Sequence, residues 1–171
     1  MNKAFEYALS LHGLKEIVGS KHEKLIVEFF KEVGHSWIKT DETPWCCAFM
    51  GACLKKGGYD YLKEVAARKY LNYGTPTEKP EIGDIVIFKR GNSSWQGHVA
   101  FYVREDEQYI HVLGGNQSNA VNISNYPKSK LLGYRRIKQP KAVKGVLDYI
   151  DMLEAKIEQM SLLMHDLRQR L

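Results

Sequence analysis

Residues 43–49 read Thr-Pro-Trp-Cys-Cys-Ala-Phe, and this stretch is expected to place a cysteine in the first turn of a helix, at the positive end of the helix dipole. Thr43 is a favourable N-cap residue, and Pro44 fits the first helical position, where its missing N–H is harmless. Two consecutive glycines follow, so we expect a helix over residues 44–56. The unpaired N–H groups and the dipole of a helix start stabilise a thiolate, the reactive form of cysteine. The stretch therefore predicts Cys46 as a nucleophile.

A candidate base and a candidate orienting residue lie on a predicted hairpin. His98 opens the apolar run 97–103, and a second run over 108–113 leads into Asn116. The start of one strand of an antiparallel hairpin lies beside the end of the other, so His98 and Asn116 should be neighbours. Together with Cys46 they have the order and chemistry of a Cys–His–Asn triad. The imidazole deprotonates the thiol, and the amide oxygen fixes the ring's tautomer and orientation.

Four short motifs occur in a fixed order: Trp-Cys-Cys-Ala-Phe at 45–49, Gly-Asp-Ile-Val-Ile-Phe at 83–88, Gly-His-Val-Ala-Phe at 97–101 and Gly-Gly-Asn-Gln at 114–117. Over residues 3–137 the chain resembles the CHAP and NlpC-type papain-like peptidoglycan hydrolases, and most of all the short phage- and prophage-encoded wall amidases or endopeptidases. The resemblance implies Cys46 as nucleophile, His98 as base and Asn116 as the orienting residue. It also implies an α+β fold in which the cysteine helix packs on a small antiparallel barrel or sheet.

Two positions depart from that family pattern. Gly114 stands where many CHAP members carry an acidic residue, two positions before the asparagine. Cys47 follows the nucleophile, where close relatives usually have a serine or another small residue. Helical geometry turns Cys47 about 100° away from Cys46, which favours packing over attack on the substrate.

Each candidate also has a purely structural interpretation. In this interpretation Cys46 is a core residue, because it shares a helix face with Phe49, Met50 and Cys53. We expect Cys53 itself to be such a core residue. His98 would then be a strand-edge histidine in a satisfied hydrogen bond, and Asn116 a turn residue. For Asp84, which precedes a predicted strand, we favour the structural role of a turn residue.

Three further residues are predicted to contact the substrate. Trp95 lies in the glycine- and serine-rich loop that leads into His98, so it should flank the cleft and stack on a glycan or peptide stem, with surface packing as the alternative. Trp45 and Gln117 are the other two predicted contacts. The histidines and cysteines show no metal-ligand spacing, so we expect no metal site and no cofactor.

Composition is consistent with one catalytic domain over residues 1–139. The chain has 171 residues and is 44% hydrophobic, enough for one substantial core. Three cysteines, an odd number, argue against a disulfide framework. No secretory signal and no membrane-spanning run is visible, so we expect synthesis in the bacterial cytoplasm and action on the wall after holin-type release or injection. The net charge of +5 suits an anionic partner such as bacterial cell wall, but it is ordinary enough that we favour a merely solvated surface as its explanation, and no nucleic-acid module is recognisable.

Periodicity gives the order of the remaining elements. Helices are predicted over residues 4–11, 21–33 and 65–72, in addition to the helix at 44–56. Strands are predicted over residues 85–89, 98–104, 108–113, 121–124 and 131–137.

After residue 139 the pattern changes to a helical heptad repeat. Apolar residues recur with gaps of three and four at Val143, Val146, Ile150, Leu153, Ile157, Met160, Met164, Leu167 and Leu171. Residues 140–171 are therefore predicted to form an amphipathic or coiled-coil helix, with a homo-oligomer assembled through residues 141–171. The alternative is a helix that folds back onto its own catalytic domain.

These features predict a cysteine hydrolase that cleaves an amide bond in the stem peptide or at the glycan–peptide junction of bacterial peptidoglycan. Two alternatives remain open. One is a papain-like enzyme of another class, such as an acyltransferase or an injected toxin. The other is a non-catalytic wall-binding scaffold whose functional part is the tail.

Overall fold

The computed structural model of the chain describes residues 2–138 and 149–161. The chain divides into two compact units, Met1–Lys138 and Gln139–Leu171. Within the second unit, residues 149–161 are helical. The rest of the predicted heptad helix lies outside the described residues.

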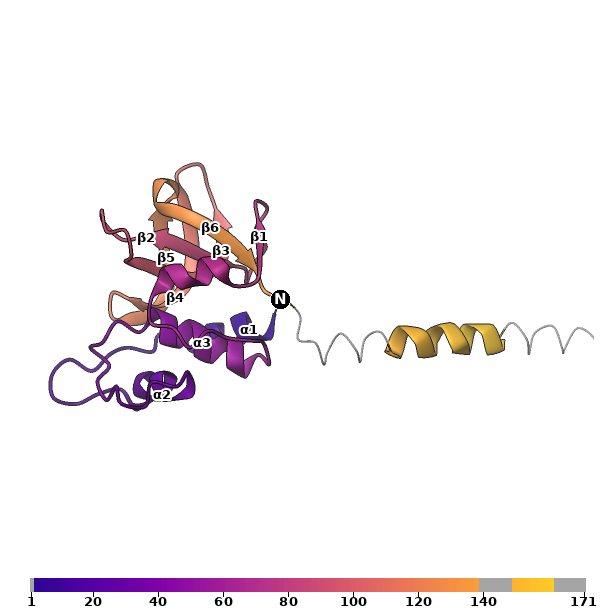
Figure 1. The fold of residues 1–171 in the computed structure, drawn as a ribbon, viewed down its shortest axis with the longest axis horizontal. Helices are drawn as coiled ribbons and strands as arrows, with labels where there is room; N and C mark the ends of the chain where they lie inside the picture. The colour runs from indigo at the N-terminus through magenta and orange to yellow at the C-terminus, as the bar shows by residue number, and fades with distance from the viewer. Residues whose placement is uncertain (1, 139–148, 162–171) are drawn as a thin grey trace, which may run out of the picture. The chain divides into compact units, whose positions relative to one another are not determined.

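The first unit combines helices with one antiparallel sheet (Figure 1), so the predicted α+β class is confirmed. Its elements, in chain order, are α1 (Lys3–Ser10), α2 (Lys24–Glu32), α3 (Cys46–Lys56), the 3₁₀ helix η1 (Ala67–Asn72), β1 (Thr75–Thr77), β2 (Ile85–Lys89), β3 (Gly97–Glu105), β4 (Tyr109–Gln117), β5 (Ala120–Pro127), the 3₁₀ helix η2 (Lys128–Lys130) and β6 (Leu131–Arg136).

The sheet has six strands in the order β1-β6-β2-β3-β4-β5, and both of its faces are covered. Side chains alternate between the faces of a strand, and β2 shows the consequence. Ile85 and Ile87 belong to the core shared with the helices, whereas Val86 and Phe88 belong to a second cluster of apolar side chains on the opposite face. The same division holds in β3, where Val99 faces the helices and Ala100 faces the second cluster.

Helix α3 lies at the centre of the larger core. Its residues from Cys46 to Leu54 are all buried, because α1 and α2 pack on it from one side and β3 and β4 from the other. In Figure 1 these three helices lie together beneath the sheet. A helix that is enclosed all round is held by its packing, so its N-terminus has a fixed position relative to β3 and β4.

Two predicted helices differ from the structure, and one strand was not predicted. The helix expected at 44–56 begins at Cys46, and Trp45 rather than Thr43 is its N-cap residue, without a side-chain capping bond. The helix expected at 65–72 is a 3₁₀ helix. The short strand β1 was not predicted. It contains Pro76, which is tolerated because β1 is an edge strand that pairs with β6.

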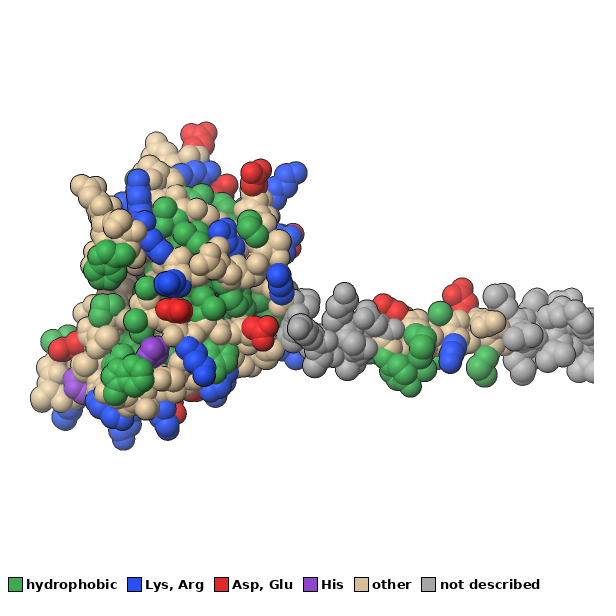
Figure 2. Space-filling model, viewed as in Figure 1, with side chains coloured by type: hydrophobic (Ala, Val, Ile, Leu, Met, Phe, Trp, Pro, Cys, Tyr) green, Lys and Arg blue, Asp and Glu red, His purple; other side chains and the backbone are tan. Residues whose placement is uncertain are grey.

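The surface of the first unit carries both signs of charge. On the face shown in Figure 2, Lys and Arg side chains are interspersed with Asp and Glu side chains. Across the described ranges, 2–138 and 149–161, we find no helix with the length and apolar character needed to cross a membrane.

Candidate active site

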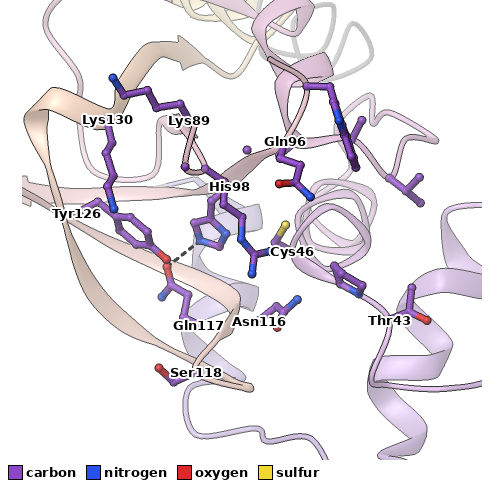
Figure 3. A pocket seen from close by; sticks show the side chains of 18 residues that line it. Thr43, Cys46, Lys89, Gln96, His98, Asn116, Gln117, Ser118, Tyr126 and Lys130 are labelled. Carbon is purple, nitrogen blue, oxygen red and sulfur yellow. Dashed lines mark hydrogen bonds between the residues drawn. The ribbon is translucent and has the colours of Figure 1, made fainter. Parts of the chain in front are cut away.

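A cavity of about 500 Å³ opens where the N-terminus of α3 meets the sheet (Figure 3). This volume is in the range of small-molecule sites. Its lining comes from segments far apart in the sequence, namely residues 43–44, 46, 65–67, 89–91, 95–98, 116–118, 126 and 130.

Cys46 is the cysteine that reaches this cavity. Its side chain is 8% exposed, and it occupies the first position of α3. The first hydrogen bond of the helix runs from the N–H of Phe49 to the carbonyl of Trp45, so the N–H groups before Phe49 precede the helical ladder. The thiol of Cys46 therefore lies at a helix N-terminus, as its position in the sequence indicates.

The surroundings of Cys46 favour the thiolate. Its sulfur lies 4.0 Å from the sulfur of Cys47. This hydrogen bond and the neighbouring His98 imidazole hold the pKa of the Cys46 thiol well below its usual range, although burial opposes them. A lowered pKa increases the share of the thiol that is present as thiolate, the nucleophilic form of cysteine.

The other two cysteines have the opposite electrostatics. The same hydrogen bond, together with burial, raises the pKa of Cys47 well above its usual range. Burial raises the pKa of Cys53 in the same direction. Neither side chain lines the cavity, and both are closed off in the core. The three thiols are therefore chemically distinct, and Cys46 is the one suited to attack.

His98 lies beside Cys46 and is held by Gln117. The ring atom Nε2 of His98 is 2.9 Å from Oε1 of Gln117, the bond drawn in Figure 3. The amide of Gln117 cannot be turned round, because its Nε2 donates to the carbonyl oxygen of Asn122 at 2.6 Å. An amide oxygen only accepts, so Nε2 of His98 carries a proton and Nδ1 of the neutral ring is unprotonated.

The residue that contacts the His98 ring is Gln117, one position after the predicted Asn116. Asn116 lines the cavity, but its side chain makes no hydrogen bond to His98 in the described part of the chain. Asn116 has a φ of 58°, and the pairing of β4 with β5 shifts register between Gly114 and Gln117. This bulge breaks the alternation of side chains and turns Gln117, predicted as a substrate contact, toward His98.

Two glycines in the same bulge explain why the strand fits there. A Cβ at Gly115 would lie 2.4 Å from the Trp45 ring, so β4 passes directly over that side chain. A Cβ at Gly114 would lie 2.9 Å from Oε1 of Gln117. The amide of Gln117 thus occupies the space that a side chain at position 114 would need, the position at which many CHAP members have an acidic residue.

An aromatic ring supports the imidazole from the side. Tyr126 of β5 stacks on His98 with ring centroids 5.1 Å apart and planes at 17°. The same tyrosine stacks on Phe88, 4.6 Å away. Burial is the main cause that raises the pKa of Tyr126 to about 12, so its hydroxyl stays protonated at neutral pH. Stacking on one side and the Gln117 bond at the edge together restrict rotation of the His98 ring.

The two tryptophans predicted as substrate contacts have different environments. The prediction that Trp45 contacts the substrate is wrong, because the side chain is fully buried against Phe29 and Phe49. Its Nε1 donates to Glu16 at 2.6 Å. Its bulk packs α3 onto the sheet. Trp95 lines the cavity with 67% of its surface exposed, so its ring is free to meet a ligand.

Arg68 fixes the loop that carries Trp95. The guanidinium of Arg68 donates through Nε to the carbonyl of Gln96 at 2.8 Å and through Nη2 to the carbonyl of Ser93. The hydroxyl of Ser93 in turn accepts from the N–H of Gln96 at 3.0 Å. This loop forms one wall of the cavity, and nothing in its glycine- and serine-rich sequence indicated that an arginine more than twenty residues earlier would hold it.

Asp84 has the structural role that the sequence favoured. It is buried outside the cavity, where it accepts from the N–H of Glu81 at 2.8 Å and from Nη2 of Arg136 at 3.1 Å. Among the residues described, no three His, Cys, Asp or Glu side chains gather as ligands for a metal ion.

Comparison with known proteins matches the part of the chain that carries Cys46, His98 and Asn116. Residues 38–116 match the family model described as CHAP domain. No curated protein matches the chain. Among solved structures, one match is a Staphylococcus aureus protein described as similar to lipoprotein, of the NLP/P60 family, at 15% identity and a TM-score of 0.40. The alignment covers 72% of this chain and 45% of that one.

Proposed function

Residues 38–116 of this chain match the CHAP domain family model, and on this basis we propose that the protein is a cysteine hydrolase that cleaves an amide bond of bacterial peptidoglycan. The observation that carries the proposal is the arrangement of Cys46, His98 and Gln117 in one cavity at a helix N-terminus. The bond to be cleaved is either the muramoyl–alanine linkage or a peptide bond of the stem.

The proposed reaction begins with transfer of the Cys46 proton to Nδ1 of His98. The resulting thiolate attacks the carbonyl carbon of the amide and forms a C–S bond, while the carbonyl oxygen takes up negative charge. The backbone N–H of Cys46, at the start of α3, is suited to donate to that oxygen. Because Gln117 holds the ring from its Nε2 edge, the imidazolium that forms has a fixed orientation.

The second half of the reaction uses the same proton. The C–N bond breaks, and His98 protonates the departing amine, which leaves a thioester on Cys46. His98 then takes a proton from a water molecule, the hydroxide attacks the thioester carbonyl, and the carboxylic acid product leaves as the thiol is restored. Peptidoglycan, water and the described side chains account for every atom in this cycle.

Digestion of purified peptidoglycan tests the proposal. We expect the full-length protein to release new amino groups, and mass analysis of the products to show one cleaved amide linkage. The masses distinguish free stem peptides, produced by an amidase, from stem fragments, produced by an endopeptidase. A control amidase should degrade the same walls. If this protein leaves them intact, the proposal is contradicted, and a toxin, an acyltransferase or a binding scaffold is favoured.

We also propose that the C-terminal segment assembles copies of this chain. In the helix at 149–161, the side chains of Ile150, Leu153, Ile157 and Met160 follow the heptad spacing and are 39–67% exposed. An exposed apolar stripe on one helix face gains free energy when a second copy covers it.

Truncation after Gln139 tests the assembly. We expect light scattering to report an oligomer for the full-length protein and a folded monomer for the truncated one. The truncated protein should keep its activity on small soluble wall fragments and lose activity on intact walls, where linked active sites gain from a raised effective concentration. A monomeric full-length protein would instead support a helix that folds back onto the catalytic unit.

A further inference from the structure

The two sides of the cavity differ in their chemistry. Pro44, Val65 and Ala66 give the cavity an apolar part of its lining, and Pro44 directly precedes the N-cap residue of α3. Arg90 and Lys130 also line the cavity, and Arg90 lies close enough to Tyr126, the ring stacked on His98, for its charge to act on the Tyr126 hydroxyl and oppose the rise in its pKa. Figure 3 shows Lys130 extending to the ring of Tyr126, on the far side of His98 from Thr43. Since Tyr126 stacks on His98, Lys130 lies on the same side of the cavity as the general acid of the proposed reaction, with the Tyr126 ring between them.

The cationic side has no balancing carboxylate. Lys89 adds a third positive side chain to the lining, and among the residues that the structure describes no Asp or Glu lines the cavity. Within residues 2–138 and 149–161, none of these three cations is engaged in an ion pair, whereas Lys128 on the same turn as Lys130 binds Glu105 at 3.3 Å. Uncompensated cations in a concave site raise the local concentration of anions and strengthen their binding.

We propose that Arg90 and Lys130 form a subsite for a carboxylate on the leaving-group side of the scissile amide. The assignment of the side follows from His98, because the residue that protonates the departing amine must lie next to it. The residue that leaves therefore carries a free carboxylate, and the apolar side of the cavity receives a small uncharged group on the acyl side. The identity of the substrate at this subsite rests on the proposed function. The preference of the subsite for a negative charge does not depend on it.

Alkylation of Cys46 tests the charge preference without any wall substrate. Iodoacetate and iodoacetamide have nearly the same size, and only the first carries a carboxylate. We measure the alkylation rate with iodoacetate divided by the rate with iodoacetamide. At low salt we expect this ratio to fall roughly threefold in Arg90→Gln and in Lys130→Gln, and about tenfold in the double variant. Lys128→Gln is the matched control, because its charge is paired and it does not line the cavity; its ratio should stay at the wild-type value.

A pair of soluble amide substrates tests the side of the subsite. One has a free carboxylate on the leaving residue, and the other has the corresponding carboxamide. We expect kcat/KM to favour the carboxylate about tenfold in the wild-type protein, mostly through KM, and to show no preference in the double variant.

The two arms separate the two claims. If the wild-type protein cleaves neither substrate, the proposed function fails, and the alkylation ratio still decides whether the subsite exists. An alkylation ratio unchanged in the double variant would overturn the subsite, whatever the enzyme cleaves. A preference for the carboxylate that survives in the double variant would overturn the assignment to the leaving-group side.

Discussion

Replacement of Cys46 by alanine is expected to lower the rate of wall hydrolysis by a factor on the order of 10⁴ or more, because no other thiol lines the cavity. The fold should survive, since the change removes one sulfur atom at a helix N-terminus and leaves no new buried polar group. The loss in unfolding free energy should stay near 1 kcal/mol, a typical value for such substitutions. Turnover of soluble wall fragments and thermal unfolding of the same samples measure the two effects.

Cys47→Ala and Cys53→Ala are the matched controls for this variant. Both should keep most of the activity, although Cys47→Ala removes the hydrogen bond that helps to lower the pKa of Cys46. In that variant the pKa of Cys46 should rise, so the rate of its alkylation by iodoacetamide should fall at pH values below the usual thiol pKa of about 8.5. Activity that survives in Cys46→Ala and disappears in Cys47→Ala would show that the nucleophile is misassigned.

The parts of this site that could be predicted from the sequence are those set by local rules. An N-terminal cysteine on a helix with glycines at its end, and a histidine at the start of an apolar run, each depend on residues within a few positions. The hairpin geometry then brings the start of β3 close to the end of β4, and the structure places His98 and Asn116 around one cavity accordingly.

The choice between Asn116 and Gln117 could not be made in the same way. The sequence favoured Asn116 because it follows the strand whose end lies beside the start of the His98 strand, and uninterrupted alternation would also put residue 116 on the face of β4 that His98 shares. Because of the bulge between Gly114 and Gln117, the side chain that faces His98 is that of Gln117 and not that of Asn116. A pair of glycines followed by an asparagine is a signal for irregular backbone, but it does not tell which side chain returns to the original face.

The role of Trp45 was predicted wrongly, and Tyr126 was not predicted at all, for a related reason. Both are aromatic residues whose roles depend on partners far away in the sequence, Glu16 for Trp45 and His98 for Tyr126. Trp45 adjoins the nucleophile along the chain, yet its side chain points into the core, because the residue before a helix need not face the same way as the first helical residue. Contacts of this kind follow from the packing of α3 and β5, which local patterns do not specify.

Replacement of His98 by alanine is the second large effect that we expect. It removes both the base for Cys46 and the acid for the leaving amine, so kcat should fall by a factor on the order of 10³ to 10⁴. Gln117→Leu should lower kcat about 10²-fold, because the ring loses the acceptor that fixes its tautomer and orientation. Asn116→Ala should change kcat less than Gln117→Leu does, since its side chain makes no hydrogen bond to the ring.

The pH dependence of Cys46 alkylation distinguishes a positioning role for Gln117 from a merely structural one. In the wild-type protein the thiolate should persist well below pH 8.5, because the lowered pKa of Cys46 keeps it ionised until the pH falls through that value. His98→Ala should move this titration back toward 8.5, and Gln117→Leu should move it part of the way with unfolding temperature little changed. Gln117→Asn, which shortens the side chain but keeps the amide, serves as the control for the loss of packing. If Asn116→Ala shifts the titration more than Gln117→Leu does, the orienting residue is Asn116 after all.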